Sequence, residues 1–395
     1  MPTATTRKPT MRHTTSPDIV HVSSAHPWTD NRVHLREAAG AAAAGYRVRL
    51  IAVESDVTAP DTGVEVVTVP RRRRRARMVL STLQVTWLAC RSQARVVHLH
   101  DPELVWSVPL HRLLGRRVVF DAHEDLPDQV LGKDYLAGRR RRLLRTGLGL
   151  FARAVVRLAA TADRVVAATE TIEQTYPRHK TVLVRNFPRL RAGEESAAPA
   201  SARRPVAVYV GALGAERGAA ELLRLARSPE LPHGWALEVA GTVSSPFIAQ
   251  IEDEAARSAS PLVFHGQLAP VATRDLLLTA PVGLVLFQPT AAHLNSLPTK
   301  MFEYMAAGQA VILSDFPLWR ELLAPHDCAT FVDPNDPQAA ARAIARYASD
   351  PELLDRHGRN ARAAAASIFS WESEERVLVG VYRDLLTPTP SPRTR

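Results

Sequence analysis

Residues 295–308, NSLPTKMFEYMAAG, combine residue types that suit an anion-binding helix N-terminus. Pro298 favours the first turn of a helix, where its missing N–H is not needed, and Gly308 can end the helix. We expect Asn295 or Ser296 to cap it. Because the free N–H groups and partial positive charge of a helix N-terminus attract anions, this segment is a candidate phosphate site.

Two charged side chains in this segment add to its chemistry. Lys300 lies in the first turn, where its charge opposes the helix dipole unless an anion binds beside it. It is also one of only four lysines among 50 basic residues. Glu303 lies one turn beyond Pro298 and could accept hydrogen bonds from a ribose diol. The alternative is an ordinary capped helix, with Met301 and Phe302 in the core and Lys300 in solvent.

A second segment suited to anions is VGALGAERG, residues 210–218. Its glycines, among them Gly211 and Gly218, follow a predicted strand and let the backbone approach a phosphate closely, while Arg217 supplies charge. The spacing differs from G-x-G-x-x-G, so the nicotinamide fingerprint is absent. An ordinary strand-to-helix turn is the alternative.

Histidine and aspartate gather at residues 98–101, which read HLHD. His98, His100 and Asp101 could imitate a metal cluster, but a strand places only alternate residues on one face. A closed metal site needs further fixed ligands, and no Asp-x-Asp motif lies in a suitable loop. We therefore predict no metal, and expect His100 and Asp101 at a strand end that faces a ligand.

The elements that would position these residues alternate along the chain. Short β-branched runs and longer helical stretches follow one another, as in a doubly wound parallel sheet. The predicted strands are 18–23, 47–53, 64–69, 95–100, 117–121, 164–168, 181–184, 205–210, 235–240, 262–265, 282–287, 310–313 and 329–332. The predicted helices are 32–44, 77–91, 102–114, 139–160, 216–227, 246–257, 270–279, 298–306, 337–348, 351–368 and 372–386. The predicted fold class is α/β with two Rossmann-like sheets, which bind ligands at the carboxyl ends of their strands.

The domain boundaries follow from a break in this rhythm. Residues 191–204 are small, polar and charged, and we interpret them as a linker. Residues 18–190 would form an N-terminal Rossmann-like domain, and residues 205–370 a C-terminal one. The polar tails, 1–17 and 388–395, are expected to be disordered.

The composition excludes several classes of protein. No run approaches the ~18 apolar residues of a membrane span, and two cysteines exclude a disulfide framework, so we expect a cytoplasmic protein. The arginine-rich composition is typical of a GC-rich, for example actinobacterial, genome. The net charge of +10 belongs to the first half, in which residues 1–190 hold 31 basic and 17 acidic side chains.

The excess charge predicts an anionic partner for the first half. Two basic, amphipathic stretches, Arg71–Arg77 and Arg139–Arg157, suit an anionic membrane surface, and a solvated face is the alternative. Nucleic acid is excluded as a partner because no aromatic-interleaved motif accompanies these arginines.

Together, the two anion-binding segments resemble the nucleotide-sugar site of glycosyltransferase family 4, which has the GT-B architecture. Gly211, Leu213 and Gly218 match the family's glycine-rich loop, and Arg217 stands for the loop lysine. Glu303 matches the second acid of the E-x7-E motif. The resemblance extends to HPWTDNRVHLREAAGAAAAGYRVRLI, VVHLHDPEL, VVFDAHED and VRNFP of the first half, which look like a bacterial branch with N-S-x-P-T-K-x-F-E-Y-M-A.

Three features depart from the family pattern. Ala212 replaces the loop arginine, which removes one diphosphate contact. Asn295 replaces the first acid, so the donor sugar would meet an amide, which can still donate and accept hydrogen bonds. The sequence SSAHPWTD, residues 23–30, replaces the glycine-rich acceptor-side loop.

The resemblance, which covers roughly residues 18–387, implies a retaining, metal-independent glycosyltransferase without a cofactor, in which the leaving diphosphate takes the acceptor proton. It also implies that the helix over 371–387 crosses back to the N-terminal domain. The catalytic candidates are His123, Lys300 and Arg217. The donor-binding candidates are Gly211, Arg217, Asn295, Ser296, Leu297, Pro298, Thr299, Lys300 and Glu303. The acceptor-side candidates are His26, Arg32, His100, Asp101 and Glu124.

The expected activity is transfer of a sugar from a nucleotide-diphosphate sugar to a hydroxyl acceptor. UDP is the preferred nucleotide and GDP the runner-up, and the acceptor could be a cell-envelope lipid, a polysaccharide or a metabolite. A sugar-nucleotide epimerase and a non-catalytic GT-B protein that binds a membrane or a partner are the alternatives, the latter favoured by Ala212 and Asn295. The enzyme would be cytoplasmic, and peripheral on the inner face of the plasma membrane if the basic stretches dock there.

Overall fold

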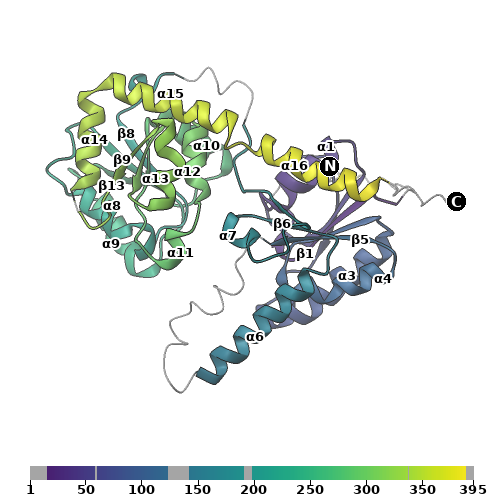
Figure 1. Cartoon of the computed structure of the whole chain (residues 1–395). Helices are drawn as coiled ribbons and strands as arrows, with labels where there is room; N and C mark the ends of the chain where they lie inside the picture. The colour runs from purple at the N-terminus through teal and green to yellow at the C-terminus, as the bar shows by residue number, and fades with distance from the viewer. Residues whose placement is uncertain (1–15, 58–59, 123–141, 191–197, 337, 388–395) are drawn as a thin grey trace, which may run out of the picture. The chain divides into compact units, whose positions relative to one another are not determined.

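The protein divides into two compact units. The computed structural model describes residues 16–57, 60–122, 142–190, 198–336 and 338–387. Unit 1 consists of Met1–Arg185 and Glu374–Arg395, and unit 2 of Asn186–Ser373 (Figure 1). Most of the tail and linker segments named above, and the histidine at position 123, lie outside the described residues.

Unit 1 contains a parallel sheet of seven strands in the order β3-β2-β1-β4-β5-β6-β7. This order reverses direction between β1 and β4, which defines the switch point where open α/β sheets bind ligands. The strands are β1 (Ile19–Pro27), β2 (Val48–Val53), β3 (Glu65–Val69), β4 (Val96–Leu99), β5 (Arg117–Ala122), β6 (Arg164–Ala167) and β7 (Thr181–Leu183).

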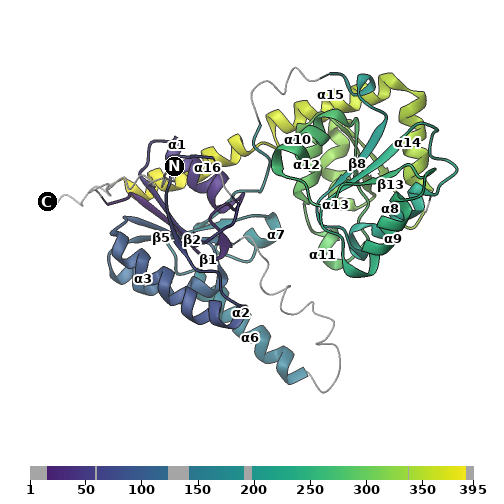
Figure 2. The same ribbon diagram turned by 180° about the vertical axis from the view of Figure 1, so that it is seen from behind.

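Helices cover both faces of this sheet. Figures 1 and 2 show α3, α4 and α6 on one face, and α1 and α16 on the other. The last of these, α16, comes from the far end of the chain, so a C-terminal helix completes the N-terminal unit. The helical elements are η1 (Val33–Ala38), α1 (Ala39–Ala43), α2 (Arg74–Ala76), η2 (Arg77–Ser81), α3 (Thr82–Ser92), η3 (Pro102–Ser107), α4 (Val108–Leu113), α6 (Arg142–Ala159), α7 (Glu170–Glu173) and α16 (Trp371–Leu386).

Unit 2 repeats the same topology with six parallel strands in the order β10-β9-β8-β11-β12-β13, and its switch point lies between β8 and β11. The strands are β8 (Val206–Val210), β9 (Ala236–Ala240), β10 (Leu262–Phe264), β11 (Val282–Val285), β12 (Ala310–Ser314) and β13 (Ala329–Val332). The helical elements are η7 (Ala200–Ala202), η8 (Ala215–Arg217), α8 (Ala219–Ala226), α9 (Ser245–Ala255), α10 (Pro270–Thr279), α11 (Ala291–Leu294), α12 (Thr299–Ala306), α13 (Pro317–Leu323), η9 (Ala324–His326), α14 (Ala339–Ser349) and α15 (Pro351–Ser367).

The α/β fold with two Rossmann-like parallel sheets is confirmed, and each strand in the described residues was predicted within a few positions. The predicted caps of α12 are wrong. Residues 291–294 form the short helix α11, and Asn295 and Ser296 donate hydrogen bonds to carbonyl groups of that helix instead. Pro298 precedes α12 without a side-chain cap. In the described residues, no helix is long and apolar enough to cross a membrane.

Candidate functional site

The donor-binding candidates of unit 2 converge at the carboxyl ends of its central strands. Three glycines make this convergence possible. Gly211 and Gly241, at the ends of β8 and β9, have φ angles of 119° and 135°, and a Cβ on Gly241 would overlap the carbonyl oxygen of Gly211. A Cβ on Gly218, whose φ is 89°, would overlap the carbonyl oxygen of Leu286 beyond β11. Side chains at these positions would therefore force the loops apart.

The Lys300 ammonium group lies beside this glycine loop. Its Nζ atom is buried and has no hydrogen-bond partner among the described residues. A Cβ on Gly211 would lie 3.3 Å from it. Burial, and to a smaller extent Arg217, lowers the pKa of Lys300 to about 7, against the opposing effect of Glu303. A buried cation without a hydrogen-bonding partner is costly, so the site favours a ligand that supplies negative charge.

Aromatic residues hold Lys300 in place. Its Nζ atom lies 3.7 Å from the ring centroid of Tyr209 and 5.2 Å from that of Phe287, so the charged form gains cation–π contacts but no hydrogen bond. The hydroxyl of Tyr304 accepts a hydrogen bond of 2.8 Å from the N–H of Val210, which ties α12 to the end of β8. Gly283 of β11 leaves room for the Tyr304 ring, which a Cβ would overlap.

The other donor-side candidates differ in how far they are exposed to solvent. Arg217 is exposed and its guanidinium lies 3.4 Å from the carbonyl oxygen of Ala212. Glu303 is half-buried on α12, on the same element as Lys300. Asn295 is exposed at the end of α11.

The segment between α11 and α12 is anchored by core packing. The backbone oxygen of Ser296 accepts a hydrogen bond of 2.7 Å from the indole N–H of Trp319, which is fully buried. Leu297 packs against the hydrophobic core, and Pro298 and Thr299 lead into the helix. The hydrogen bond from Trp319 and the packing of Leu297 therefore fix the segment that leads into the N-terminus of α12.

A cavity of about 230 Å³ adjoins the glycine loop. It is lined by the ends of β8 and β9, including Gly211 and Gly241, and by Gln267, Leu268 and Thr273 from the segment after β10. It therefore lies at the ligand-binding edge of this sheet.

In unit 1, Asp101 is buried and organises the irregular C-terminal part of β1, where the strand register shifts between Val22 and Pro27. Its Oδ2 atom accepts hydrogen bonds from the backbone N–H of Ser24 and Ala25 and from the hydroxyl of Ser23. Its Oδ1 atom lies 3.0 Å from Nδ1 of His26. Burial opposes a charge on His26, but Asp101, together with Asp30 and Asp121, outweighs it and raises the pKa of His26 to about 9. Asp101 is thus committed to this part of β1 and does not face an open site.

Arg32 is also engaged inside unit 1. Its Nε and Nη2 atoms donate to both carboxylate oxygens of Asp121 at 3.0 and 2.8 Å, and its Nη1 atom donates to the carbonyl oxygen of Val184. Glu37 lies 2.9 Å from its Nε atom. Burial and the charge of Asp121 raise the pKa of Glu37, against the effect of Arg32. A protonated Glu37 would leave Arg32 and Asp121 as a balanced, bidentate pair.

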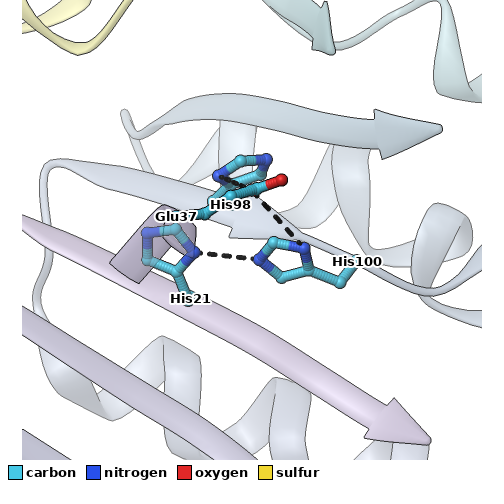
Figure 3. Close-up of side chains that lie close together, drawn as sticks. All are labelled: His21, Glu37, His98 and His100. Atoms are coloured by element: carbon cyan, nitrogen blue, oxygen red, sulfur yellow. Dashed lines mark hydrogen bonds and ion pairs between the residues drawn. The ribbon is translucent and has the colours of Figure 1, made fainter. Parts of the chain in front are cut away.

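Three buried histidines complete this polar core (Figure 3). If each carries its proton on Nδ1, one set of hydrogen bonds runs from His98 to Tyr382, then to His21, His100 and Asp121, over distances of 2.7, 3.3, 2.9 and 3.2 Å. Burial lowers the pKa values of His21 and His98, which keeps both neutral. The chain of bonds fastens α16 to β1 and β4.

The same residues include a possible set of metal ligands. One ligand atom from each of His21, Glu37, His98 and His100 lies within 4.8 Å of the others. A metal ion at this place would have to replace the His21–His100 hydrogen bond and contend with the cation of Arg32. The hydrogen bonds already account for most of these ring nitrogens, so we interpret the cluster as a structural polar core. The absence of a metal stays a prediction.

The structure brings Lys300 and the glycine loop of unit 2 together, and it places the described acceptor-side candidates in two polar groups of unit 1. His26 pairs with Asp101, whereas Arg32 and His100 both contact Asp121. His123 and Glu124 lie outside the described residues. Sequence reasoning missed Gly241 and the tyrosines at positions 209 and 304. The glycine after a predicted strand was a usable signal, whereas the tyrosines looked like ordinary core residues.

Comparison with known proteins agrees with this architecture. The family model "Glycosyltransferase Family 4" matches residues 31–183, and "Glycosyl transferases group 1" matches residues 194–364. The fold and these two matches together support a GT-B glycosyltransferase that is similar to family 4.

Solved structures with the same fold cover nearly the whole chain. A glycosyltransferase from Rickettsia africae is 13% identical with a TM-score of 0.69, over 94% of this chain and 99% of that one. Anabaena HepE in complex with UDP-glucose is 13% identical with a TM-score of 0.65, over 93% and 100%. At such low identities the likeness concerns the fold alone.

Two curated relatives match shorter segments. A lipopolysaccharide core biosynthesis mannosyltransferase of Rhizobium leguminosarum is 37% identical over 84 residues, which is 21% of this chain and 24% of the relative. An MMP alpha-(1->4)-mannosyltransferase of Mycolicibacterium hassiacum is 32% identical over 108 residues, 27% of this chain and 25% of the relative. Each match therefore spans about a quarter of the relative's length.

The substitution Tyr382→Phe tests the buried histidine network. Loss of the hydroxyl leaves groups on His98 and His21 unsatisfied, so unit 1 should lose about 1–3 kcal/mol of unfolding free energy. Hydrogen exchange of the full chain should show faster exchange in α16 and β4 and unchanged exchange in unit 2. Tyr46→Phe removes the same atom from a half-buried ring and is the control. Equal protection in both variants would contradict the proposed role of the network.

Proposed function

We propose that this protein is a glycosyltransferase that transfers a sugar from a nucleotide-diphosphate sugar to a hydroxyl acceptor. The observation that carries the proposal is the buried Nζ atom of Lys300 next to the glycine loop at Gly211, which finds no hydrogen-bond partner in the part of the chain that the structure describes. A diphosphate there would supply the missing hydrogen-bond acceptors. The family matches to both halves of the chain and the mannosyltransferase names of the two relatives support the same class of reaction.

The donor would bind along the ligand-binding edge of unit 2. Its diphosphate would lie against Lys300, the N-terminus of α12 and the backbone of the glycine loop, with Arg217 able to reach it from the exposed rim. The 230 Å³ cavity beyond Gly241 could receive the base, and Glu303 the ribose. UDP is our preferred nucleotide, because HepE carries UDP-glucose on the same fold. GDP is the runner-up.

The reaction would retain the anomeric configuration and need no metal. The positive groups would stabilise the charge that develops on the leaving diphosphate, which is where such a site gains most of its rate. The leaving diphosphate would take the proton of the acceptor hydroxyl, so no protein base is required. Asp101 and Arg32 would act indirectly, by holding the acceptor-side loop and the ends of β5 and β7.

Membrane association of unit 1 is a second part of the proposal. The arginines at 71–77 precede a row of exposed apolar side chains: Met78, Val79, Leu80, Leu83 and Trp87. On α6, Leu150 and Phe151 are exposed beside Arg153. Apolar residues bordered by arginine suit the interface of an anionic bilayer, so the enzyme would work at the inner face of the plasma membrane.

Titration with nucleotides tests the proposed function. Purified protein should bind UDP, or failing that GDP, by calorimetry, with the same affinity in the presence of EDTA. UDP-glucose and GDP-mannose then identify the sugar. Binding that requires a divalent ion would overturn the metal-free mechanism. No binding of any nucleotide would favour the non-catalytic alternative, in which Ala212 and Asn295 mark a lost donor site.

The substitution Lys300→Met separates a functional from a structural role. Removal of a buried charge without a partner should raise the melting temperature of the free protein, because the cost of burying that charge disappears. The same change should weaken UDP binding at least tenfold. Arg224→Met, which removes a half-exposed cation from α8, is the control and should leave binding unchanged. A loss of stability together with unchanged binding would show that Lys300 is structural.

A further inference from the structure

A second cavity lies in unit 1, and it is bordered by cations. It measures about 320 Å³ and is lined by Ser24, Ala25, Pro27, Val53, Arg71, Arg72 and Arg77. These residues come from the carboxyl ends of β1 and β2 and from the segment that follows β3. The cavity therefore lies at the edge where α/β sheets bind ligands, on the side of β1 that faces β2 and β3.

Two of the arginines are held in fixed positions. The Nη1 atom of Arg72 donates a hydrogen bond of 3.2 Å to the hydroxyl of Ser81. The Nη2 atom of Arg77 lies 3.1 Å from Glu103, while its Nε atom is buried without a hydrogen-bond partner among the described residues. Each guanidinium has five donors, so both can still bind an anion without first giving up these contacts.

The wall of the cavity formed by β1 is rigid as well. Asp101 fixes the backbone of Ser24 and Ala25 through its Oδ2 atom. The hydroxyl of Ser24 also lies 3.2 Å from Glu103, the acid that orients Arg77. The loop and the arginines thus share one set of contacts, which reduces the entropic cost of ordering them around a ligand.

We propose that this cavity binds a phosphate group carried by the acceptor. Guanidinium groups match the geometry of phosphate oxygens. Three of them line this cavity, whereas one would be enough for a single contact with a phosphate at the surface. The volume falls in the range of about 300–1,000 Å³ that is usual for small-molecule sites, so part of the molecule that carries the phosphate also fits. This inference rests on the proposed function, since it names the chemical class of that enzyme's acceptor.

Two sources of phosphate fit this chemistry. One is a soluble phosphorylated sugar or metabolite. The other is a lipid headgroup, because Met78, Val79 and Leu80 follow Arg77 directly and are all more than half exposed. The site recognises the same group in both cases, and the experiment below separates them.

The direct test is calorimetric titration of the full-length protein with inorganic phosphate at low ionic strength, without nucleotide. Arg71→Ala/Arg72→Ala should weaken phosphate binding at least tenfold. Arg73→Ala/Arg75→Ala removes the same charge from exposed positions that do not line the cavity, and should change it less than threefold. Equal weakening in both pairs, or no binding by the unmodified protein, would overturn the proposal.

Two further arms complete the design. Phosphate binding that survives in Lys300→Met belongs to unit 1, whereas its loss there would assign the phosphate to unit 2 and overturn the proposal. Because no nucleotide is present, a failure of UDP binding would leave this result intact, so the two proposals fail separately.

Vesicles of phosphatidylcholine with either phosphatidic acid or phosphatidylglycerol identify the source of the phosphate. A preference for phosphatidic acid that only Arg71→Ala/Arg72→Ala abolishes supports a lipid-borne phosphate, and phosphate binding without this preference supports a soluble one.

Discussion

The buried ammonium group of Lys300 is the constraint to which the rest of unit 2 is adapted. A buried cation whose hydrogen-bond donors find no acceptor costs free energy, and Lys300 has none among the residues that the structure describes. The elements around it are arranged to keep it in place. The Tyr304 hydroxyl ties α12 to β8, and Gly283 leaves room for the Tyr304 ring. The ring of Tyr209 packs against the ammonium group. Such a site is organised before its anion arrives, so little reorganisation is left for the binding step.

In unit 1, buried polar residues hold the carboxyl ends of the strands in place. Asp101 holds the end of β1, and Arg32 joins the ends of β5 and β7. The histidine network continues from Asp121 through the sheet to Tyr382. The C-terminal helix thereby becomes part of the N-terminal unit. Polar cores of this kind cost desolvation but fix one arrangement of the elements that share them.

The sequence predicted the strands well because parallel strands buried on both faces are nearly continuous apolar runs, as in Val206–Val210 and Val282–Val285. Short helices such as α7, α11 and α13 were missed, since one or two turns give too little periodicity. The missed α11 explains the wrong cap prediction for α12. Carbonyl groups of α11 accept hydrogen bonds from the side chains of Asn295 and Ser296, so these side chains do not cap α12. No sequence pattern predicted these hydrogen bonds.

The candidate site was predictable where local chemistry decides it and hidden where tertiary packing does. The glycines and Lys300 were identified from residue type and spacing. The burial of Asp101 and His100 was not foreseen, because a polar residue at a strand end can equally face a ligand or the core. The pairing of His98 with Tyr382 joins residues 284 positions apart, which only the fold can reveal.

The protonation state of Lys300 tests this account most directly. With a pKa of about 7, Lys300 is mostly neutral at pH 8 in the free protein, and a bound diphosphate should restore its charge by raising that pKa. UDP binding at pH 8 should therefore take up close to one proton, measured by calorimetry in buffers of different ionisation enthalpy. The uptake should decline towards pH 6, where Lys300 is already protonated, and vanish in Lys300→Met. UDP binding with no proton uptake at pH 8 would contradict the account.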